Sequence, residues 1–251
     1  MIRPNLTFVS PGDKITEKRM CSFGTSLFIG VPERSGKMEG AIFDMDGTLL
    51  DSMHFWNEVG TDYLKEQGIT PPVGLFERLK CMSLRQAAEY FRSEFGVRES
   101  AEEVMCKMNR IVEKRYFEES SAKPYVEEYL EQLQKQGVRM CVATATDAYL
   151  AEAALYRTGL NRFFSFVITC GQVGRGKDDP LIFEEALCRL GTRKRKTVVF
   201  EDSLFAIRTA KRAGFSVIAL YDDASRWDKI KIQRIADAYY ESFAPLCGDN
   251  P

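Results

Sequence analysis

The sequence lacks an excess of charge of either sign. Its 251 residues include 35 lysines and arginines and 36 aspartates and glutamates. Proteins that bind nucleic acid through its phosphate backbone usually carry a basic field, and this chain has none. We therefore predict no nucleic-acid partner, and a small molecule is the better expectation.

The sequence also lacks the signals of a membrane protein, an exported protein or a zinc protein. No apolar run approaches the roughly 18 residues of a membrane span, and residues 25–31 are too short for a signal peptide. The seven cysteines are odd in number and form no C-x-x-C pair, which argues against a disulfide framework or a zinc site. We expect a soluble, cytoplasmic protein without a membrane partner, either a monomer or a small homo-oligomer.

The first 37 residues differ in composition and hydrophobic pattern from the rest of the chain. They carry three prolines and no sustained helical or strand period, so we predict a loose N-terminal extension. The codons permitted for residues 33–37, directly before Met38, include purine-rich stretches that resemble a bacterial ribosome-binding site. Met38 is therefore a candidate start, and residues 1–37 are a candidate non-native segment.

The remaining sequence has enough apolar residues for one sizeable core, or for a core and a small second domain. A short apolar strand at residues 41–43 precedes a stretch with helical spacing at about residues 55–123. Strands and helices then alternate, with strands at 138–143, 166–169, 197–200 and 216–220 and helices at 126–136, 148–158, 181–190 and 204–213. This pattern predicts an α/β fold with a doubly wound parallel sheet at residues 38–54 and 124–246, an inserted all-helical cap at 55–123, and a tail at 247–251.

Carboxylates follow two of the predicted strands. Asp44 and Asp46 follow the first strand, and Glu201 and Asp202 follow the strand at 197–200. Ligands of open parallel sheets bind beyond the carboxyl ends of the strands, where these four carboxylates would repel one another. A hard divalent cation resolves the repulsion, and oxygen ligands of this kind suit Mg²⁺. Asp44 and Asp46 can face one substrate, so that one attacks phosphorus while the other handles protons.

Other residues near the strand ends suit a phosphoryl group. Gly47 permits close backbone approach, and Thr48 adds a hydroxyl. Thr144 offers its hydroxyl, and neighbours such as Ala145 offer backbone N–H groups, at the start of a predicted helix. Lys177 adds a mobile point charge from the loop before the helix at 181–190. Together these residues predict the phosphate clamp that phosphoryl transfer chiefly requires.

In this order, the residues resemble the four motifs of the haloacid dehalogenase superfamily. The motifs are Phe-Asp-Met-Asp-Gly-Thr-Leu-Leu-Asp-Ser at residues 43–52, then Thr144, Lys177, and Glu-Asp-Ser at residues 201–203. The resemblance covers about residues 39–246, and the helical insert is similar to the cap of the phosphatase and β-phosphoglucomutase-like branch. It implies a Rossmann-like core with a mobile helical lid.

The resemblance also implies the chemistry. Asp44 and Asp202 would bind Mg²⁺ through their carboxylates and Asp46 through its backbone carbonyl, with Glu201 close behind. Asp44 would be the nucleophile and Asp46 the general acid and base. The implied activity is that of a Mg²⁺-dependent phosphatase that hydrolyses a small phosphomonoester, such as a sugar phosphate, through an aspartyl-phosphate intermediate. Asp46 sets the chain apart from the dehalogenases, which lack that aspartate.

Departures from the family pattern concern the hinge and the cap. Tyr125 follows Pro124 where a glycine is frequent, and Asp178 follows Lys177 where a proline is frequent. Helical spacing also favours a role in the cap core, rather than in a substrate site, for Met82, Phe91 and Phe95.

Two candidate cap contacts to the substrate, His54 and Arg85, bear on the choice of reaction. His54 is too close to the first motif to match the histidine of sugar-phosphate mutases, Trp56 stands about where that histidine would be, and Arg85 is one place late for the mutases' cap arginine. We therefore favour a phosphatase over a hexose-phosphate mutase. A non-catalytic phosphate-binding protein is a third alternative, which the presence of all the motif aspartates disfavours.

Overall fold

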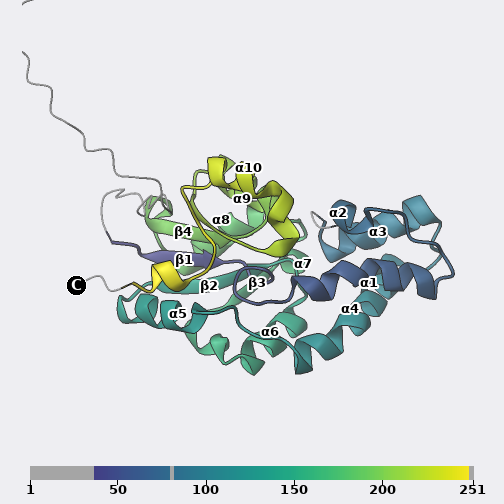
Figure 1. The fold of residues 1–251 in the computed structure, drawn as a ribbon, viewed down its shortest axis with the longest axis horizontal. Helices are drawn as coiled ribbons and strands as arrows, with labels where there is room; N and C mark the ends of the chain where they lie inside the picture. The colour runs from purple at the N-terminus through teal and green to yellow at the C-terminus, as the bar shows by residue number, and fades with distance from the viewer. Residues whose placement is uncertain (1–36, 80–81, 249–251) are drawn as a thin grey trace, which may run out of the picture.

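A six-stranded parallel sheet forms the centre of the protein in a computed structural model that describes residues 37–79 and 82–248 (Figure 1). The predictions for residues 1–36 and for the last three residues of the tail lie outside the described residues. The strands are β1 (Gly40–Phe43), β2 (Arg139–Thr144), β3 (Val167–Thr169), β4 (Thr197–Glu201), β5 (Ser216–Leu220) and β6 (Ala238–Tyr240).

The sheet has the strand order β3-β2-β1-β4-β5-β6, which is that of the Rossmann fold. β1 lies between β2 and β4, with Phe43 beside Val142 on one side and Phe200 on the other. The direction in which strands are added reverses between β1 and β4. A ligand crevice is therefore expected beyond the carboxyl ends of these two strands.

Helices cover both faces of the sheet because neighbouring residues of each buried strand point to opposite faces. Phe43 packs in the core under α5 (Val126–Lys135) and α6 (Ala148–Arg157), whereas Ile42 packs under the helices of the other face. Those helices are α8 (Leu181–Leu190), α9 (Leu204–Arg212) and α10 (Lys229–Ile235), and Figure 1 shows the two layers on either side of the strands. Shorter helices complete the core: α7 (Cys170–Val173) and the 3-10 helices Leu160–Phe163, Lys194–Lys196, Asp223–Asp228 and Ala244–Leu246.

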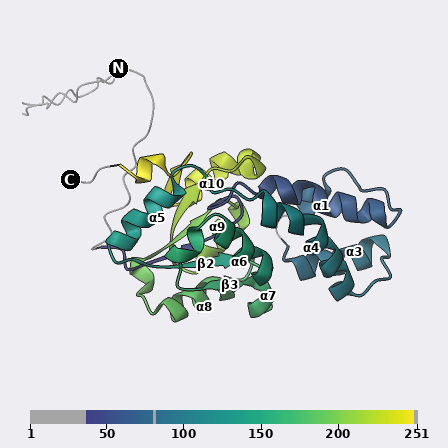
Figure 2. The same ribbon diagram turned by 90° about the horizontal axis from the view of Figure 1, so that it is seen from below.

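Four helices lie to one side of the sheet, between β1 and α5 in sequence (Figures 1 and 2). They are α1 (Met53–Glu66), α2 (Leu75–Leu79), α3 (Leu84–Phe95) and α4 (Ala101–Glu118). Ser83 and Ser100 begin α3 and α4 with capping boxes. The rings of Tyr63 and Phe91 stack 5.4 Å apart among these helices, and both are fully buried. No described residue between β1 and α5 lies in a β-strand.

The predicted fold class is therefore confirmed, including the all-helical insert. Predicted core elements agree with the structure to within about two residues at each end. The sequence patterns did not predict α7, α10 or β6. β6 and α7 have three and four residues, which is too short for a hydrophobic period to be recognised in sequence.

Two linkers connect the helical insert to the sheet and pair with each other. Leu50 and Ala122 form an antiparallel bridge. The Asp51 backbone N–H donates to the carbonyl of Ser121 at 3.0 Å, and the Lys123 N–H donates to that of Leu49 at 2.9 Å. The entry to the insert and the exit from it are therefore held side by side.

Tyr125 begins α5 with a backbone φ of +64°, the only positive φ of a non-glycine residue among those described. This is the position where the resembled family often has glycine. Tyr125 therefore adopts a left-handed conformation that glycine adopts without strain.

Among the described residues, no helix combines the length and apolar character needed to cross a membrane.

We expect Tyr125→Gly to stabilise the protein by about 0.5–1 kcal/mol. Relief of about 1–2 kcal/mol of left-handed strain outweighs the larger conformational entropy that glycine adds to the unfolded chain. Urea unfolding measures the change. Tyr156→Gly is the control, because Tyr156 is an exposed residue inside helix α6, where glycine costs about 1 kcal/mol. Equal losses in both variants would contradict the assignment of strain to Tyr125.

Candidate active site

Three buried carboxylates meet at the carboxyl ends of β1 and β4. Asp44 directly follows β1, and its backbone N–H donates to the Phe200 carbonyl at 2.9 Å, which extends the pairing of the two strands. Glu201 ends β4 and Asp202 follows it. One oxygen from each of Asp44, Glu201 and Asp202 lies within 4.8 Å of the other two. Sheet topology thus brings together carboxylates that are more than 150 residues apart in sequence.

Lys177 lies between two of these carboxylates. Its Nζ donates to Oδ1 of Asp44 and, at 2.7 Å, to Oε1 of Glu201, and its side chain is only 4% exposed. The sequence predicted a mobile charge at this position, whereas the structure holds it against two acceptors. Three carboxylates and one ammonium group leave the cluster with a formal charge of −2 when all are ionised.

The excess of negative charge affects the acidity of the cluster. Burial, opposed by Lys177 and reinforced by Glu201 and Asp46, raises the pKa of Asp44 to about 7. Burial and the neighbouring Glu201 raise the pKa of Asp202 as well. Burial alone would lower the pKa of Lys177, but Asp44 and Glu201 raise it above its ordinary value. The protein has thus removed these carboxylates from water with too few positive charges to balance them.

A divalent cation with oxygen ligands fits this cluster. Oδ2 of Asp202 is buried and has no hydrogen-bond partner, although a buried carboxylate oxygen normally has one. A doubly charged ion would balance the formal charge of the cluster and give this oxygen a partner. The donor set consists of hard oxygens alone, which suits Mg²⁺.

The residues around Asp202 hold its carboxylate in place. Thr48 is fully buried, and its Oγ1 donates to Oδ1 of Asp202 at 3.3 Å. Oε2 of Glu201 accepts the backbone N–H groups of Asp202 and Ser203, at 2.8 and 2.9 Å. Gly47 has a φ of +86°, and a Cβ at that position would stand 2.8 Å from Oδ2 of Asp202. Thr48 and Gly47, which the sequence suggested for phosphate binding, therefore contact Asp202.

Asp46 is not part of the three-carboxylate cluster, and it accepts hydrogen bonds from three hydroxyl groups. Ser52 donates to its Oδ1 at 2.5 Å, and Thr146 donates to its Oδ2 at 2.7 Å. The third donor is the hydroxyl of Tyr116, on helix α4, which also accepts a hydrogen bond from Nε1 of Trp56 at 2.6 Å. Burial raises the pKa of Asp46, and the three hydroxyl groups oppose that effect.

The sequence analysis did not find Tyr116, Thr146 or the role of Ser52. Ser52 and Thr146 stand within or next to the recognised motifs, so their closeness in sequence to Asp46 and Thr144 was a usable signal. Tyr116 lies 70 residues from Asp46 inside an amphipathic helix. Its position in the sequence gave no indication that its hydroxyl reaches the site.

A cavity of about 130 Å³ lies between this edge of the sheet and the helical insert. Asp44, Asp46, Thr144, Ala145 and Lys177, all predicted site residues, line it. Oγ1 of Thr144 accepts the backbone N–H of Thr146 at 3.0 Å, so its own hydroxyl hydrogen is not used in that bond. The opposite wall is formed mainly by apolar side chains of the insert.

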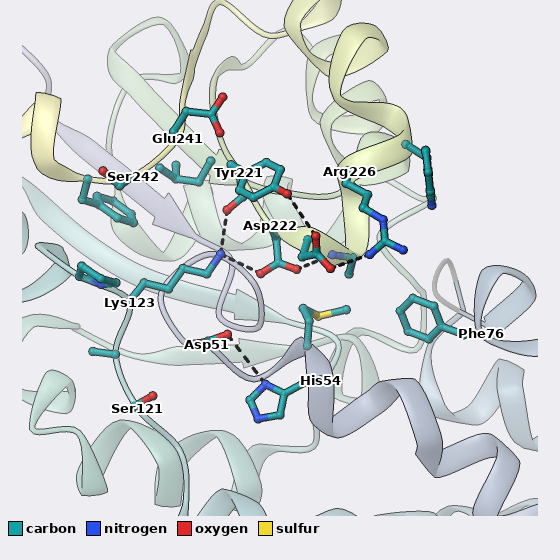
Figure 3. A pocket seen from close by; sticks show the side chains of 18 of the residues that line it. Asp51, His54, Phe76, Ser121, Lys123, Tyr221, Asp222, Arg226, Glu241 and Ser242 are labelled. Atoms are coloured by element: carbon teal, nitrogen blue, oxygen red, sulfur yellow. Dashed lines mark hydrogen bonds and ion pairs between the residues drawn. The ribbon is translucent and has the colours of Figure 1, made fainter.

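The two predicted cap contacts do not line this cavity. Arg85 is exposed and pairs with Glu102 at 2.9 Å. His54 lines a larger, neighbouring cavity of about 670 Å³, where its Nδ1 lies 3.8 Å from Oδ1 of Asp51 (Figure 3). The sequence suggested both residues as cap contacts to the substrate but could not show which way their side chains point.

Lys123 crosses one end of the larger cavity (Figure 3). From the returning linker, its Nζ reaches Oδ2 of Asp222 and the carbonyl of Tyr221, both at 2.8 Å, beyond the end of β5. Asp222 and Lys123 lie close enough to influence the pKa of Asp202 in opposite directions. The linker of the insert is therefore tied to the sheet edge beside the carboxylate cluster.

Comparison with known proteins supports the resemblance that the motifs indicated. The model of the haloacid dehalogenase-like hydrolases matches residues 41–220. A phosphorylated carbohydrates phosphatase of Thermotoga maritima is 29% identical over 181 residues, which are 72% of this chain and 84% of that protein. A fructose-1-phosphate phosphatase of Escherichia coli is 27% identical over 71% of this chain and 94% of its own length.

Among solved structures, the chain is similar to CbbY from Rhodobacter sphaeroides in complex with phosphate. The TM-score is 0.74 at 22% identity, and the match covers 83% of this chain and 96% of that one. At this identity the likeness shows a shared fold.

We expect Gly47→Ala to lower both the stability of the protein and its response to Mg²⁺. The added Cβ would require a left-handed alanine and would press on the carboxylate of Asp202. Gly214→Ala is the matched control, because Gly214 has a φ of +85° and nothing within 4 Å of the added Cβ. The control should lose about 1–2 kcal/mol from backbone strain alone.

Urea unfolding and melting temperatures in a Mg²⁺ titration separate the two effects. Gly47→Ala should lose more stability than Gly214→Ala and should show a smaller rise in melting temperature with Mg²⁺. Identical behaviour of the two variants would contradict the close packing of Gly47 against Asp202.

Proposed function

The chain belongs to the haloacid dehalogenase-like hydrolase family, and from this we propose that it is a Mg²⁺-dependent phosphatase acting on a small phosphomonoester. The observation that carries the proposal is the buried group of Asp44, Glu201 and Asp202 around Lys177, with Asp46 facing the same cavity. The relatives named as phosphatases of phosphorylated carbohydrates and of fructose 1-phosphate support phosphate-ester hydrolysis.

Mg²⁺ would be held by the carboxylates of Asp44 and Asp202 and by the backbone carbonyl of Asp46, with Glu201 behind them. When bound, the ion would neutralise charge on the phosphoryl group. Lys177 and the hydroxyl of Thr144 would bind phosphoryl oxygens, together with the backbone N–H of Ala145. We assign Gly47 and Thr48 to the support of Asp202, because that is the residue they contact.

In the first step, a carboxylate oxygen of Asp44 attacks phosphorus, and the bond from phosphorus to the leaving oxygen breaks. Asp46 gives its proton to that oxygen, so the product leaves as a neutral alcohol. In the second step, Asp46 takes a proton from a water molecule that attacks the aspartyl-phosphate. The bond between phosphorus and Asp44 then breaks, which restores both carboxyl groups and releases inorganic phosphate.

The hydroxyl groups on Asp46 suit its role as general acid and base. Tyr116 and Trp56 belong to the helical insert, residues 55–123, which we propose acts as a lid over the core. Their hydrogen bonds place Asp46 correctly only when the insert lies against the sheet. Proton transfer would thereby be linked to lid closure, which excludes bulk water from the aspartyl-phosphate.

A hexose-phosphate mutase remains the less favoured alternative. Such an enzyme must hold a second phosphate group while the first is on the enzyme, and cationic side chains commonly supply such binding. Among the described residues, no lysine, arginine or histidine of the insert lines the cavity. Hydrolysis therefore agrees better with the described part of the site.

We expect Asp44→Asn to abolish phosphate release from an aryl phosphate, with a loss of at least about a thousandfold, because the amide is a poor nucleophile. Wild-type activity should require Mg²⁺ and disappear when EDTA removes it. Asp62→Asn is the control and should retain activity, because the Asp62 side chain is partly exposed on α1.

A binding measurement separates the metal from the chemistry. Mg²⁺ should raise the melting temperature of the wild-type protein and have little effect on Asp202→Asn, because a ligand that binds only the folded state stabilises it. Full activity in Asp44→Asn, or turnover without a divalent cation, would overturn the proposed function.

We expect Tyr116→Phe to lower kcat by about tenfold for alkyl phosphates and by much less for p-nitrophenyl phosphate. The change removes one hydrogen bond that positions Asp46, and a nitrophenolate leaves with little help from an acid. Steady-state kinetics on both esters measure the difference. Tyr63→Phe is the control, since Tyr63 is also buried in the insert but donates to Glu99. Equal losses on the two esters would contradict the positioning role.

A further inference from the structure

The cavity beside Asp44 has two chemically different halves. The half on the sheet carries the charged and hydroxyl groups already described, and the half on the insert is apolar in the part of the chain that the structure describes. Helices α1, α2 and α4, with the loop before α3, contribute the side chains of Trp56, Val59, Phe76, Leu79, Met82 and Met108. The phosphate of a substrate belongs in the first half, which leaves the second half to its organic part.

Nearby polar groups of the insert are already engaged with the protein. Nε1 of Trp56 donates to Tyr116, whose own hydroxyl donates to Asp46. The guanidinium group of Arg85 is paired with Glu102, and Oε1 of Gln86 accepts the backbone N–H of Ser83 at 2.7 Å. Trp56 and Tyr116 therefore have no donor left for a substrate hydroxyl, and neither Arg85 nor Gln86 lines the cavity.

Met82 illustrates the difference between a cap core and a substrate wall. Helical spacing grouped it with Phe91 and Phe95 as a residue of the cap core. Phe91 is indeed fully buried among the helices, whereas Met82 is partly exposed and lines the cavity. An apolar side chain that faces a catalytic cavity is available to pack against the organic part of a substrate.

From these observations we infer that the substrate is a phosphomonoester of a small alcohol with an apolar carbon skeleton, such as a short alkyl or single-ring alcohol, rather than a polyhydroxylated sugar. Each sugar hydroxyl placed against this wall would lose its hydrogen bonds to water and gain none. An alkyl or aryl group in the same place removes apolar surface from water. The cavity of about 130 Å³ must also hold the phosphoryl group, so the organic group must be small, since a cavity of ~150 Å³ accommodates benzene alone.

This inference rests on the proposed phosphatase function, and a matched pair of substrates tests it. Propyl phosphate and glycerol 3-phosphate share a three-carbon skeleton and differ by two hydroxyl groups. With Mg²⁺ present, we expect kcat/KM from phosphate release to be at least about tenfold higher for propyl phosphate, because a hydrophobic pocket disfavours an added hydroxyl. Tenfold corresponds to about 1.4 kcal/mol.

Variants of helix α4 test whether the preference for propyl phosphate comes from the apolar wall of the cavity. Met108→Gln keeps the length of the side chain and adds an amide. It should therefore reduce the ratio of kcat/KM for propyl phosphate to kcat/KM for glycerol 3-phosphate at least about threefold. Met105→Gln is the matched control, because Met105 lies one turn earlier on α4 and does not line the cavity. It should leave the ratio unchanged. Met82→Gln, at a partly exposed position, provides the same test if Met108→Gln fails to fold.

The outcomes distinguish the two proposals. Glycerol 3-phosphate turned over as fast as propyl phosphate, or faster, would overturn the apolar substrate class and leave the phosphatase function intact. The absence of Mg²⁺-dependent phosphate release from both compounds and from a panel of phosphorylated metabolites would overturn both. An unchanged ratio in folded Met108→Gln and Met82→Gln would also contradict the assignment to this wall.

Discussion

The burial of three carboxylates around a single ammonium group is the constraint on which the rest of the site depends. Asp44, Glu201 and Asp202 lie out of water with only Lys177 between them, and one oxygen of Asp202 has no partner. Burying charge without balance is costly. The folding free energy of the rest of the protein can offset this unfavourable burial, and a divalent cation can complete the cluster.

Backbone geometry keeps that cluster in place. β1 and β4 are neighbours at the point where the strand order reverses, so their ends deliver Asp44 and Glu201 to one crevice. The left-handed Gly47 lets the loop after β1 lie against Asp202, where a Cβ would collide. Glu201 accepts two backbone N–H groups with the oxygen that Lys177 does not use. The main chain thus positions the three carboxylates, and two of them in turn hold Lys177.

The helical insert supplies two features that the core lacks. It brings Tyr116 to Asp46, which joins a helix of the insert to the proposed acid and base. It also closes the cavity with apolar side chains, whereas the core contributes charge and hydroxyl groups. This contrast between the core and the insert agrees with a division of roles, in which the core carries out the phosphate chemistry and the insert decides the substrate preference. The paired linkers and the contact between Lys123 and Asp222 hold the connection of the insert against the edge of the core sheet.

The fold class, the family and the residues at the strand ends could be predicted from the sequence, because strand period, helix period and short motifs are local signals. Asp44, Asp46, Thr144 and Lys177 could be found in this way, and all line one cavity. The direction of side chains across helices became known only from the three-dimensional structure: Tyr116 reaches Asp46, whereas His54 and Arg85 point elsewhere. Helical spacing places a residue on a surface, but packing between distant segments decides which groups that surface meets.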